Sequence, residues 1–465
     1  MSRVKAFLFV LLVWALIYLP RLGTLELKSE EGRRVLPAVT MLQTGNYIVP
    51  QVGSEPYLRK PPLVNWLVAG SFRLFGARNE WAARLPSVLS VLVVACALLA
   101  IAGRALGPNG SLAAAMMWLT NFGLLEKGRL IEIEALYVSL TALAFICWLS
   151  WWDQPRKRWL AWSCAGIFLG LALLAKGPLT LLFFYAVVIA VLWQAGELRQ
   201  LVGGPHWLGV LLMLGIFSAW GIPYLQMTEA GHAAGVWSRQ FSGRLSGEDF
   251  KLGEWLLNIP RGIAYLLPWV ALFPFARFTK LESDAERRYA KALSLGTVVP
   301  FIVVSLMPGA LPRYNLPLLA PAIWLLALFV RAHALVWPLQ LRRAITWTVV
   351  TVTGAMLIYS LAIIPFLKGR EKVRPIARKL EAAIPPNETL YAVDPDYQPY
   401  LFYLRRPIGY VATVGDLPTR ARFVLVQPKD ERAAEESPRW QPQQLRPILR
   451  IKDYRGKRVS LLEAK

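Results

Sequence analysis

The sequence has few of the residues that form disulfides or bind metals. Its 465 residues include three cysteines and three histidines. Cys96, Cys147 and Cys164 all lie in apolar segments, where cysteine usually serves as a small buried side chain. The histidines are scattered, and no Cys/His spacing typical of a zinc site is present. These absences exclude a disulfide framework. We expect no cofactor, and a divalent metal is not indicated but stays open.

Charged residues are also scarce. They form 17% of the chain, against about 25% in soluble domains, while apolar residues form 55%. This composition excludes an ordinary cytosolic enzyme, and also a disordered chain, which lacks apolar surface to bury. Acidic residues are the rarer class, with 29 Asp and Glu against 52 Lys and Arg. In a membrane protein this excess is expected to face lipid headgroups and phosphates, and we expect no nucleic acid partner.

Several apolar segments are candidates for membrane spans, because a span needs about 20 mostly apolar residues. The N-terminal segment resembles a signal peptide without a cleavage site, so we expect it to remain as a first helix. The shorter segment 62–76 carries Arg73 and is predicted to lie at the interface. The candidate spans are 5–20, 84–103, 111–125, 133–152, 158–174, 178–194, 207–223, 256–275, 290–307, 315–332 and 344–366. They predict an all-α polytopic membrane protein with about 11–13 transmembrane helices.

The charge of the short loops predicts the orientation. Basic residues between the fourth and fifth, eighth and ninth, and tenth and eleventh segments share a side with Arg3 and Lys5, and this side is predicted to be cytoplasmic. The transmembrane domain is then expected to cover 1–367, with large extracytoplasmic loops at 21–83 and 224–255. Residues 368–465 alternate apolar and polar positions between turn residues, which predicts a small extracytoplasmic α/β domain.

Charged residues gather on the predicted outer side. In the first loop, Glu30 and Glu31 precede Arg33 and Arg34. Adjacent carboxylates beside arginines suit acid/base chemistry on a charged lipid, although ion pairs in a solvated loop would give the same pattern. Glu134 lies just inside its apolar segment, and ionisable residues at membrane depth are costly and usually functional. A structural ion pair with Lys176 is the alternative for Glu134.

Further charges would complete an outer cationic pocket. Lysines and arginines there would hold a phosphate leaving group while a carboxylate takes a proton from an acceptor. The substrate class that fits this pocket is a phosphate-linked lipid. The additional residues are Glu126, Lys127, Arg129, Glu132, Arg239, Arg244, Arg313 and Tyr314.

Several short motifs follow one another over about two-thirds of the chain, and their order is informative. They are Glu30-Glu31-Gly32-Arg33, Met41–Pro50, Tyr57–Leu63, Lys176-Gly177-Pro178 and Leu311–Pro317. The ordered set resembles the polyprenyl-phosphate-sugar-dependent glycosyltransferases of the membrane-embedded GT-C superfold, glycosyltransferase family 39. That family includes protein O-mannosyltransferases and the aminoarabinose transferase that modifies lipid A.

The resemblance implies roles for individual residues. Glu30 takes the place of the family's catalytic acidic residue, usually Asp, and Glu31 is the alternative. The implied donor-phosphate-binding residues are Arg33, Lys60, Lys176, Arg244 and Arg313. The implied substrate-binding residues are Tyr57, Arg59, Glu134 and Tyr314. Arg59 stands where relatives acting on lipid A often carry an acidic residue, which counts against carrying over lipid A specificity or a metal site.

The resemblance further implies an inverting glycosyltransferase of the bacterial inner membrane. A monosaccharide would move from a polyprenyl phosphate, such as undecaprenyl phosphate, to an extracytoplasmic lipid, glycan or protein acceptor. Two other functions are a transporter or flippase of polyprenyl-linked glycans, and a membrane scaffold. Transporters usually have inverted repeats and broken midplane helices, which the sequence does not display. A scaffold would leave Glu30, Glu31 and Lys60-Pro61-Pro62 unexplained.

Overall fold

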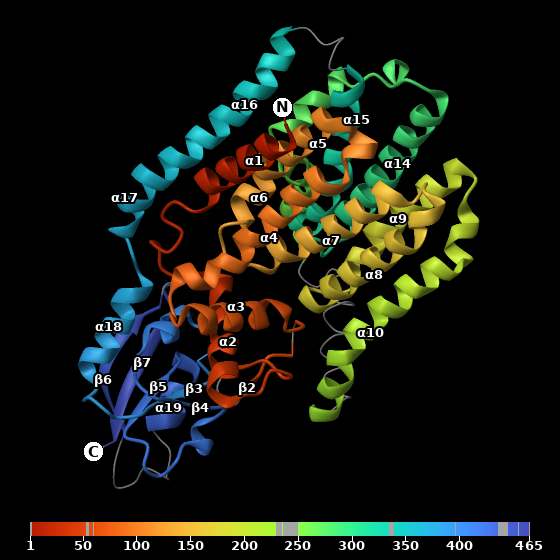
Figure 1. Ribbon diagram of the computed structural model, residues 1–465. Helices are drawn as coiled ribbons and strands as arrows, with labels where there is room; N and C mark the ends of the chain where they lie inside the picture. Colours follow the sequence, from red (N-terminus) through yellow and green to blue (C-terminus); the bar gives the residue numbers. More distant parts are fainter. Residues whose placement is uncertain are drawn as a thin grey trace. The chain divides into compact units, whose positions relative to one another are not determined.

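The computed structural model describes residues 2–52, 55–58, 60–228, 235, 250–333, 339–395, 397–435, 445–453 and 455–464. The chain forms two compact units (Figure 1). The first unit comprises Met1–Pro20, Arg59–Leu63 and Leu85–Ser360, and the second comprises Arg21–Leu58, Val64–Arg84 and Leu361–Lys465.

Seven helices in the described part of the chain are long and apolar enough to cross a membrane. Four of them are α4 (Glu80–Ile101), α7 (Ile133–Trp151), α10 (Gly204–Met227) and α14 (Asp284–Leu306). The other three spans are longer than the α-helix that each contains: Pro155–Ala175 contains α8 (Arg158–Ala175), Pro312–Ala332 contains most of α15 (Leu319–His333), and Leu339–Ala383 contains α16 (Leu339–Ile358). The predicted fold class, a helical multi-pass membrane protein with a small C-terminal α/β part, is confirmed.

The number of long apolar helices is lower than the number of predicted spans. Some segments form helices that are shorter or less apolar, namely α1 (Arg3–Tyr18), α3 (Leu63–Phe75), α5 (Gly103–Thr120), α6 (Phe122–Lys127) and α9 (Leu179–Ala195). The segment 256–275 is broken into α12 (Leu252–Leu256), α13 (Asn258–Ala264) and a 3-10 turn over Trp269–Phe275. Prolines at 260, 268 and 274 lack the N–H that a continuous helix requires.

Burial distinguishes the central helix of the first unit from a peripheral one. The apolar window of α7 is entirely buried, whereas only 22% of the corresponding window of α10 is buried. Helix α10 exposes Leu211, Leu214 and Ile222, an apolar surface that suits lipid rather than water. Helices α8 and α10 approach closely at Gly166 and Gly209, where an added Cβ would overlap backbone, as in small-residue packing between membrane helices.

The second unit combines the first loop with the C-terminal residues. From the loop come α2 (Gly32–Thr44) and the short antiparallel pair β1 (Gln51–Val52) and β2 (Glu55–Pro56). The C-terminal part begins with α17 (Ile364–Lys368) and α18 (Val373–Ala383) and ends in a mixed sheet with α19 (Pro428–Glu435). The proposed boundary at residue 367 stays a prediction.

The sheet has the strand order β4-β3-β5-β7-β6. The pairs β3–β4 and β3–β5 are parallel, whereas β5–β7 and β6–β7 are antiparallel. Its core includes Val393, Val424 and Leu462. The strands are β3 (Leu390–Val393), β4 (Ile408–Val411), β5 (Phe423–Val426), β6 (Leu445–Lys452) and β7 (Arg458–Ala464).

Candidate functional site

One group of predicted site residues meets in the first unit, around the carboxylate of Glu134. Glu134 lies in the first turn of α7, where the helix dipole favours a negative charge. Its Oε1 is 3.3 Å from Nζ of Lys176, at the end of α8, and 3.4 Å from Nε of Arg313. The ion pair with Lys176, which the sequence offered as the alternative for Glu134, is therefore present. Because Arg313 shares the same carboxylate, these three side chains carry two positive charges and one negative charge.

Two tyrosine rings complete this group. Nζ of Lys176 lies 5.1 Å from the ring centroid of Tyr137 and 4.9 Å from that of Tyr314. Both distances are within the range of cation–π attraction. We call Glu134, Lys176, Arg313, Tyr137 and Tyr314 the Glu134 cluster; its cations would attract an anion such as a phosphate.

A second ionic group stands just before α7. Lys127 lies 2.9 Å from Glu126 and 3.1 Å from Glu132. The pKa of Lys127 is raised, because the lowering effect of burial is smaller than the combined raising effect of Glu132 and Glu126. Burial raises the pKa of Glu132, against the lowering effect of Lys127. Lys127 thus has two acidic partners, and these three side chains carry one excess negative charge.

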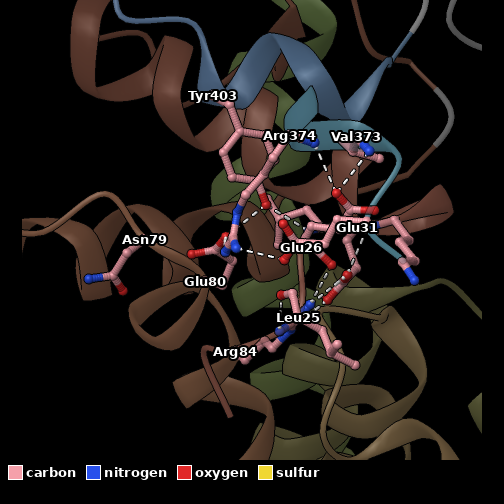
Figure 2. Close-up of polar contacts among 12 residues, drawn as sticks. Leu25, Glu26, Glu31, Asn79, Glu80, Arg84, Val373, Arg374 and Tyr403 are labelled. Carbon is pink, nitrogen blue, oxygen red and sulfur yellow. Dashed lines mark hydrogen bonds and ion pairs between the residues drawn. The ribbon is translucent and has the colours of Figure 1, made fainter. Parts of the chain in front are cut away.

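In the second unit, the two adjacent carboxylates of the first loop have different surroundings. Glu31 is buried and forms a two-point ion pair with Arg84, at 2.9 Å and 3.0 Å. Arg84 also donates to the carbonyl oxygens of Leu22, Leu25 and Glu26 (Figure 2). Glu31 therefore anchors the loop, and its carboxylate is occupied by Arg84.

Glu30 is one-third exposed and has a looser set of partners. Nη1 of Arg33 donates to both its oxygens, at 2.9 Å and 3.1 Å, and Arg34 lies 3.9 Å away. The guanidinium of Arg33 lies 5.8 Å from the ring centroid of Tyr397. Of the two carboxylates, Glu30 is the one that a substrate could reach, and it is chemically suited to act as a general base.

Two neighbouring residues hold this loop in place. Tyr57 is buried, and its hydroxyl accepts a 3.0 Å hydrogen bond from Arg34. Gly32 lies so close to the carbonyl oxygen of Tyr397 that a Cβ would overlap it. This close contact explains why the position after the acidic pair is occupied by glycine. Tyr57 thus helps to position Arg34. The role of Tyr57 in substrate binding stays a prediction.

Sequence reasoning missed the network that ties the first loop to α18. Glu26 is buried and accepts hydrogen bonds of 2.8–2.9 Å from the backbone N–H groups of residues 372–374. Glu80 forms an ion pair with Arg374 and accepts from the Tyr403 hydroxyl at 2.8 Å (Figure 2). Burial and Glu80 raise the pKa of Tyr403. These partners are about 300 residues or more apart, and no local pattern could have paired them.

We expect Glu26→Ala to loosen the start of α18, because three N–H groups would lose their acceptor. A net loss of about 1–3 kcal/mol is typical for unpaired buried donors. Hydrogen exchange at Lys372–Arg374, measured by mass spectrometry, should become faster. Lys379→Ala, at an exposed position further along the same helix, is the control. Equal exchange in both variants would contradict the capping role.

The remaining predicted residues are placed as follows. Lys60 is half-buried in the first unit, and its predicted role in binding the donor phosphate stays a prediction. Arg59 and Arg244 lie outside the described residues. The predicted residues thus fall into two groups in different units. In the described part of the chain, no three His, Cys, Asp or Glu side chains are grouped as a metal site requires.

Comparison with known proteins supports the predicted resemblance. Residues 59–222 match the family model described as dolichyl-phosphate-mannose-protein mannosyltransferase. The undecaprenyl phosphate-alpha-4-amino-4-deoxy-L-arabinose arabinosyl transferase 2 of Proteus mirabilis is 28% identical, over 70% of this chain and 59% of its own. The corresponding transferase of Pseudomonas aeruginosa (strain UCBPP-PA14) is 29% identical, over 74% and 62%. The chain spans about three-fifths of the length of these relatives.

A solved structure aligns over nearly the whole chain. The crystal structure of ArnT from Cupriavidus metallidurans bound to undecaprenyl phosphate superposes with a TM-score of 0.73 at 18% identity, covering 98% of this chain and 97% of that one. Its apo state gives a TM-score of 0.72. The chain therefore has the ArnT-type GT-C fold, and the resemblance to the GT-C glycosyltransferases that its motifs predicted is confirmed.

Proposed function

We propose that the chain is an inverting glycosyltransferase that moves a monosaccharide from a polyprenyl phosphate to an extracytoplasmic acceptor. The observation that carries this proposal is the Glu134 cluster, in which two cations share one carboxylate at the end of a buried helix. The similarity to arabinosyl transferases, and a fold shared with a protein crystallised with undecaprenyl phosphate, support a lipid phosphate as the group bound there.

Lys176 and Arg313 are proposed to stabilise the departing phosphate. In the transfer reaction the bond between the sugar and the phosphate oxygen breaks, so negative charge develops on the lipid phosphate. Preorganised cations in a site with little water stabilise such charge most effectively. Glu134 holds both cations in place. Arg33, Lys60 and Arg244 stay candidates for the same phosphate, and Arg59 and Tyr314 for the substrate.

Glu30 is proposed as the general base. It would take the proton from an acceptor hydroxyl as the hydroxyl oxygen attacks the sugar from the face opposite to the phosphate, which inverts the anomeric centre. This geometry requires one carboxylate near the acceptor, unlike the carboxylate pair of hydrolases. Glu30 is better suited than Glu31 because the Glu31 carboxylate is buried against Arg84.

The proposed location is the bacterial inner membrane, with the N-terminus in the cytoplasm. Short-loop basic residues, including Arg156 and Arg342, share the predicted side of Arg3 and Lys5, as expected of cytoplasmic loops. The reaction would then take place on the extracytoplasmic side, with a lipid, glycan or protein acceptor.

The test of this function is donor turnover by the purified full chain in nanodiscs. A panel of polyprenyl-phosphate sugars would be supplied with candidate acceptors, and released polyprenyl phosphate would be followed by mass spectrometry. Release with one donor identifies the sugar. Saturable donor binding without release from any donor and acceptor pair would favour the flippase alternative.

We expect Lys176→Met to lower donor turnover by about 10²–10³-fold, the usual cost of removing one group that stabilises transition-state charge. Arg313 still pairs with Glu134 in this variant, so the helices should stay folded. Turnover is measured by the same release assay. Lys157→Met, an exposed lysine outside the cluster, is the control. Wild-type turnover in Lys176→Met would contradict the phosphate role.

A further inference from the structure

A second polar cavity lies in the first unit, at the opposite end of α7 from Glu134. It has a volume of about 500 Å³ and is lined by residues from α5, α7, α9, α14 and α15. Ser150 lines this cavity and lies 16 residues after Glu134 on α7, about 24 Å along the helix axis. The cavity is therefore separate from the Glu134 cluster, and the proposed reaction does not use it.

The cavity carries one positive charge without a counter-charge. Five ionisable residues with full charges line it, three arginines and two acids. Arg104 pairs with Asp153 at 3.3 Å, and Arg331 pairs with Glu286. The third arginine, Arg288, is exposed and has no ion pair among the residues that the structure describes. A ligand with a single negative charge would therefore balance the charges that line the cavity.

The walls of the cavity are partly apolar. Leu149, Val191 and Leu328 line it, and the rings of Trp152 and Tyr289 stack at a centroid distance of 6.2 Å. Beside them, the buried hydroxyl of Ser150 has no hydrogen-bond partner in the described part of the chain. An arginine, an unpaired hydroxyl and apolar walls together fit a ligand with a phosphate and a hydrocarbon chain.

We propose that this cavity, named here the Arg288 cavity, binds the phosphate of an anionic phospholipid. A lipid phosphodiester with one negative charge and no cationic group in its headgroup matches the single uncompensated arginine. A zwitterionic phospholipid has no net charge to offer, and a free phosphate or a phosphomonoester carries more charge than the cavity neutralises. A charge-assisted contact from arginine to phosphate is strong and geometrically specific. The site is a second lipid site, independent of the sugar donor.

The experiment uses the delipidated full chain in detergent and follows lipid binding by native mass spectrometry. The probes are phosphatidylglycerol, phosphatidylcholine, a polyprenyl phosphate and inorganic phosphate. Arg288→Gln is compared with Arg287→Gln, a neighbour on the same helix that pairs with Asp284 at 3.2 Å and does not line the cavity. We expect Arg288→Gln to weaken phosphatidylglycerol binding about tenfold, as loss of one charge-assisted contact predicts, and Arg287→Gln to leave it unchanged.

A second variant tests the cavity rather than the charge. Ala195 is exposed and lines the cavity, so Ala195→Trp should obstruct it and weaken phosphatidylglycerol binding without altering the core. Equal effects of Arg288→Gln and Arg287→Gln would overturn the proposal, as would phosphatidylcholine binding as tightly as phosphatidylglycerol. Preference for polyprenyl phosphate or inorganic phosphate at this site would overturn the assignment to a phospholipid.

Discussion

Glu30→Gln is expected to lower the rate of sugar transfer by about 10²–10⁴-fold, the usual contribution of a general base. Glutamine keeps the shape of the side chain and one acceptor for Arg33, but it cannot take the proton of the acceptor hydroxyl. The ion pair with Arg33 is partly exposed and contributes little stability, so the melting temperature should stay close to that of the wild type. Single-turnover release of polyprenyl phosphate measures the rate.

The control for this prediction is Glu388→Gln. Glu388 belongs to the same unit and forms an exposed pair with Arg422 at 3.4 Å. It should retain both wild-type turnover and the wild-type melting temperature. A Glu30→Gln variant that transfers sugar at the wild-type rate would remove Glu30 from the role of base.

Glu31→Gln is expected to have the opposite effects: a large loss of stability and little change in the rate of sugar transfer by the folded protein. The Glu31–Arg84 pair has both side chains 4% exposed, and removing one charge leaves the other buried without compensation. Breaking a buried pair typically costs about 3–5 kcal/mol. The melting temperature of the full chain, followed by intrinsic fluorescence in detergent, should fall clearly below that of Glu388→Gln. Turnover should persist at temperatures where the variant is folded.

The two adjacent variants together decide which carboxylate is the base. If Glu31→Gln lost turnover at an unchanged melting temperature, the catalytic role would move from Glu30 to Glu31. If both variants lost stability and neither lost turnover when folded, the acidic pair would be purely structural.

The sequence was sufficient for the class of fold, because long apolar segments have few alternatives to membrane helices. It also placed Glu134 and Lys176 at the same predicted end of their segments, with an ion pair between them as the alternative to a functional role. It could not separate Glu30 from Glu31. That difference arises from Arg84, 53 residues further along the chain, and the carbonyl groups around it, and such a contact leaves no local pattern.

The sequence contains prolines that indicate the break in the segment 256–275, but hydropathy alone does not take them into account. Apolar content predicted one span, but three prolines interrupt it and the backbone forms short pieces instead. The capping of α18 by Glu26 had no signal at all, because its partners are 346–348 residues away.

The second unit is assembled from two segments near the N-terminus and one distant segment that begins at Leu361, which has a consequence for biosynthesis. At about 5–20 residues per second, a ribosome needs about 17–70 s to travel the 347 residues from Glu26 to Val373. During that interval the first loop has already been made, while the carboxylates of Glu26 and Glu80 still lack their partners from α18. Insertion of the preceding helices alone therefore cannot complete the hydrogen bonds of this loop, which form only after residues 372–374 have been synthesised.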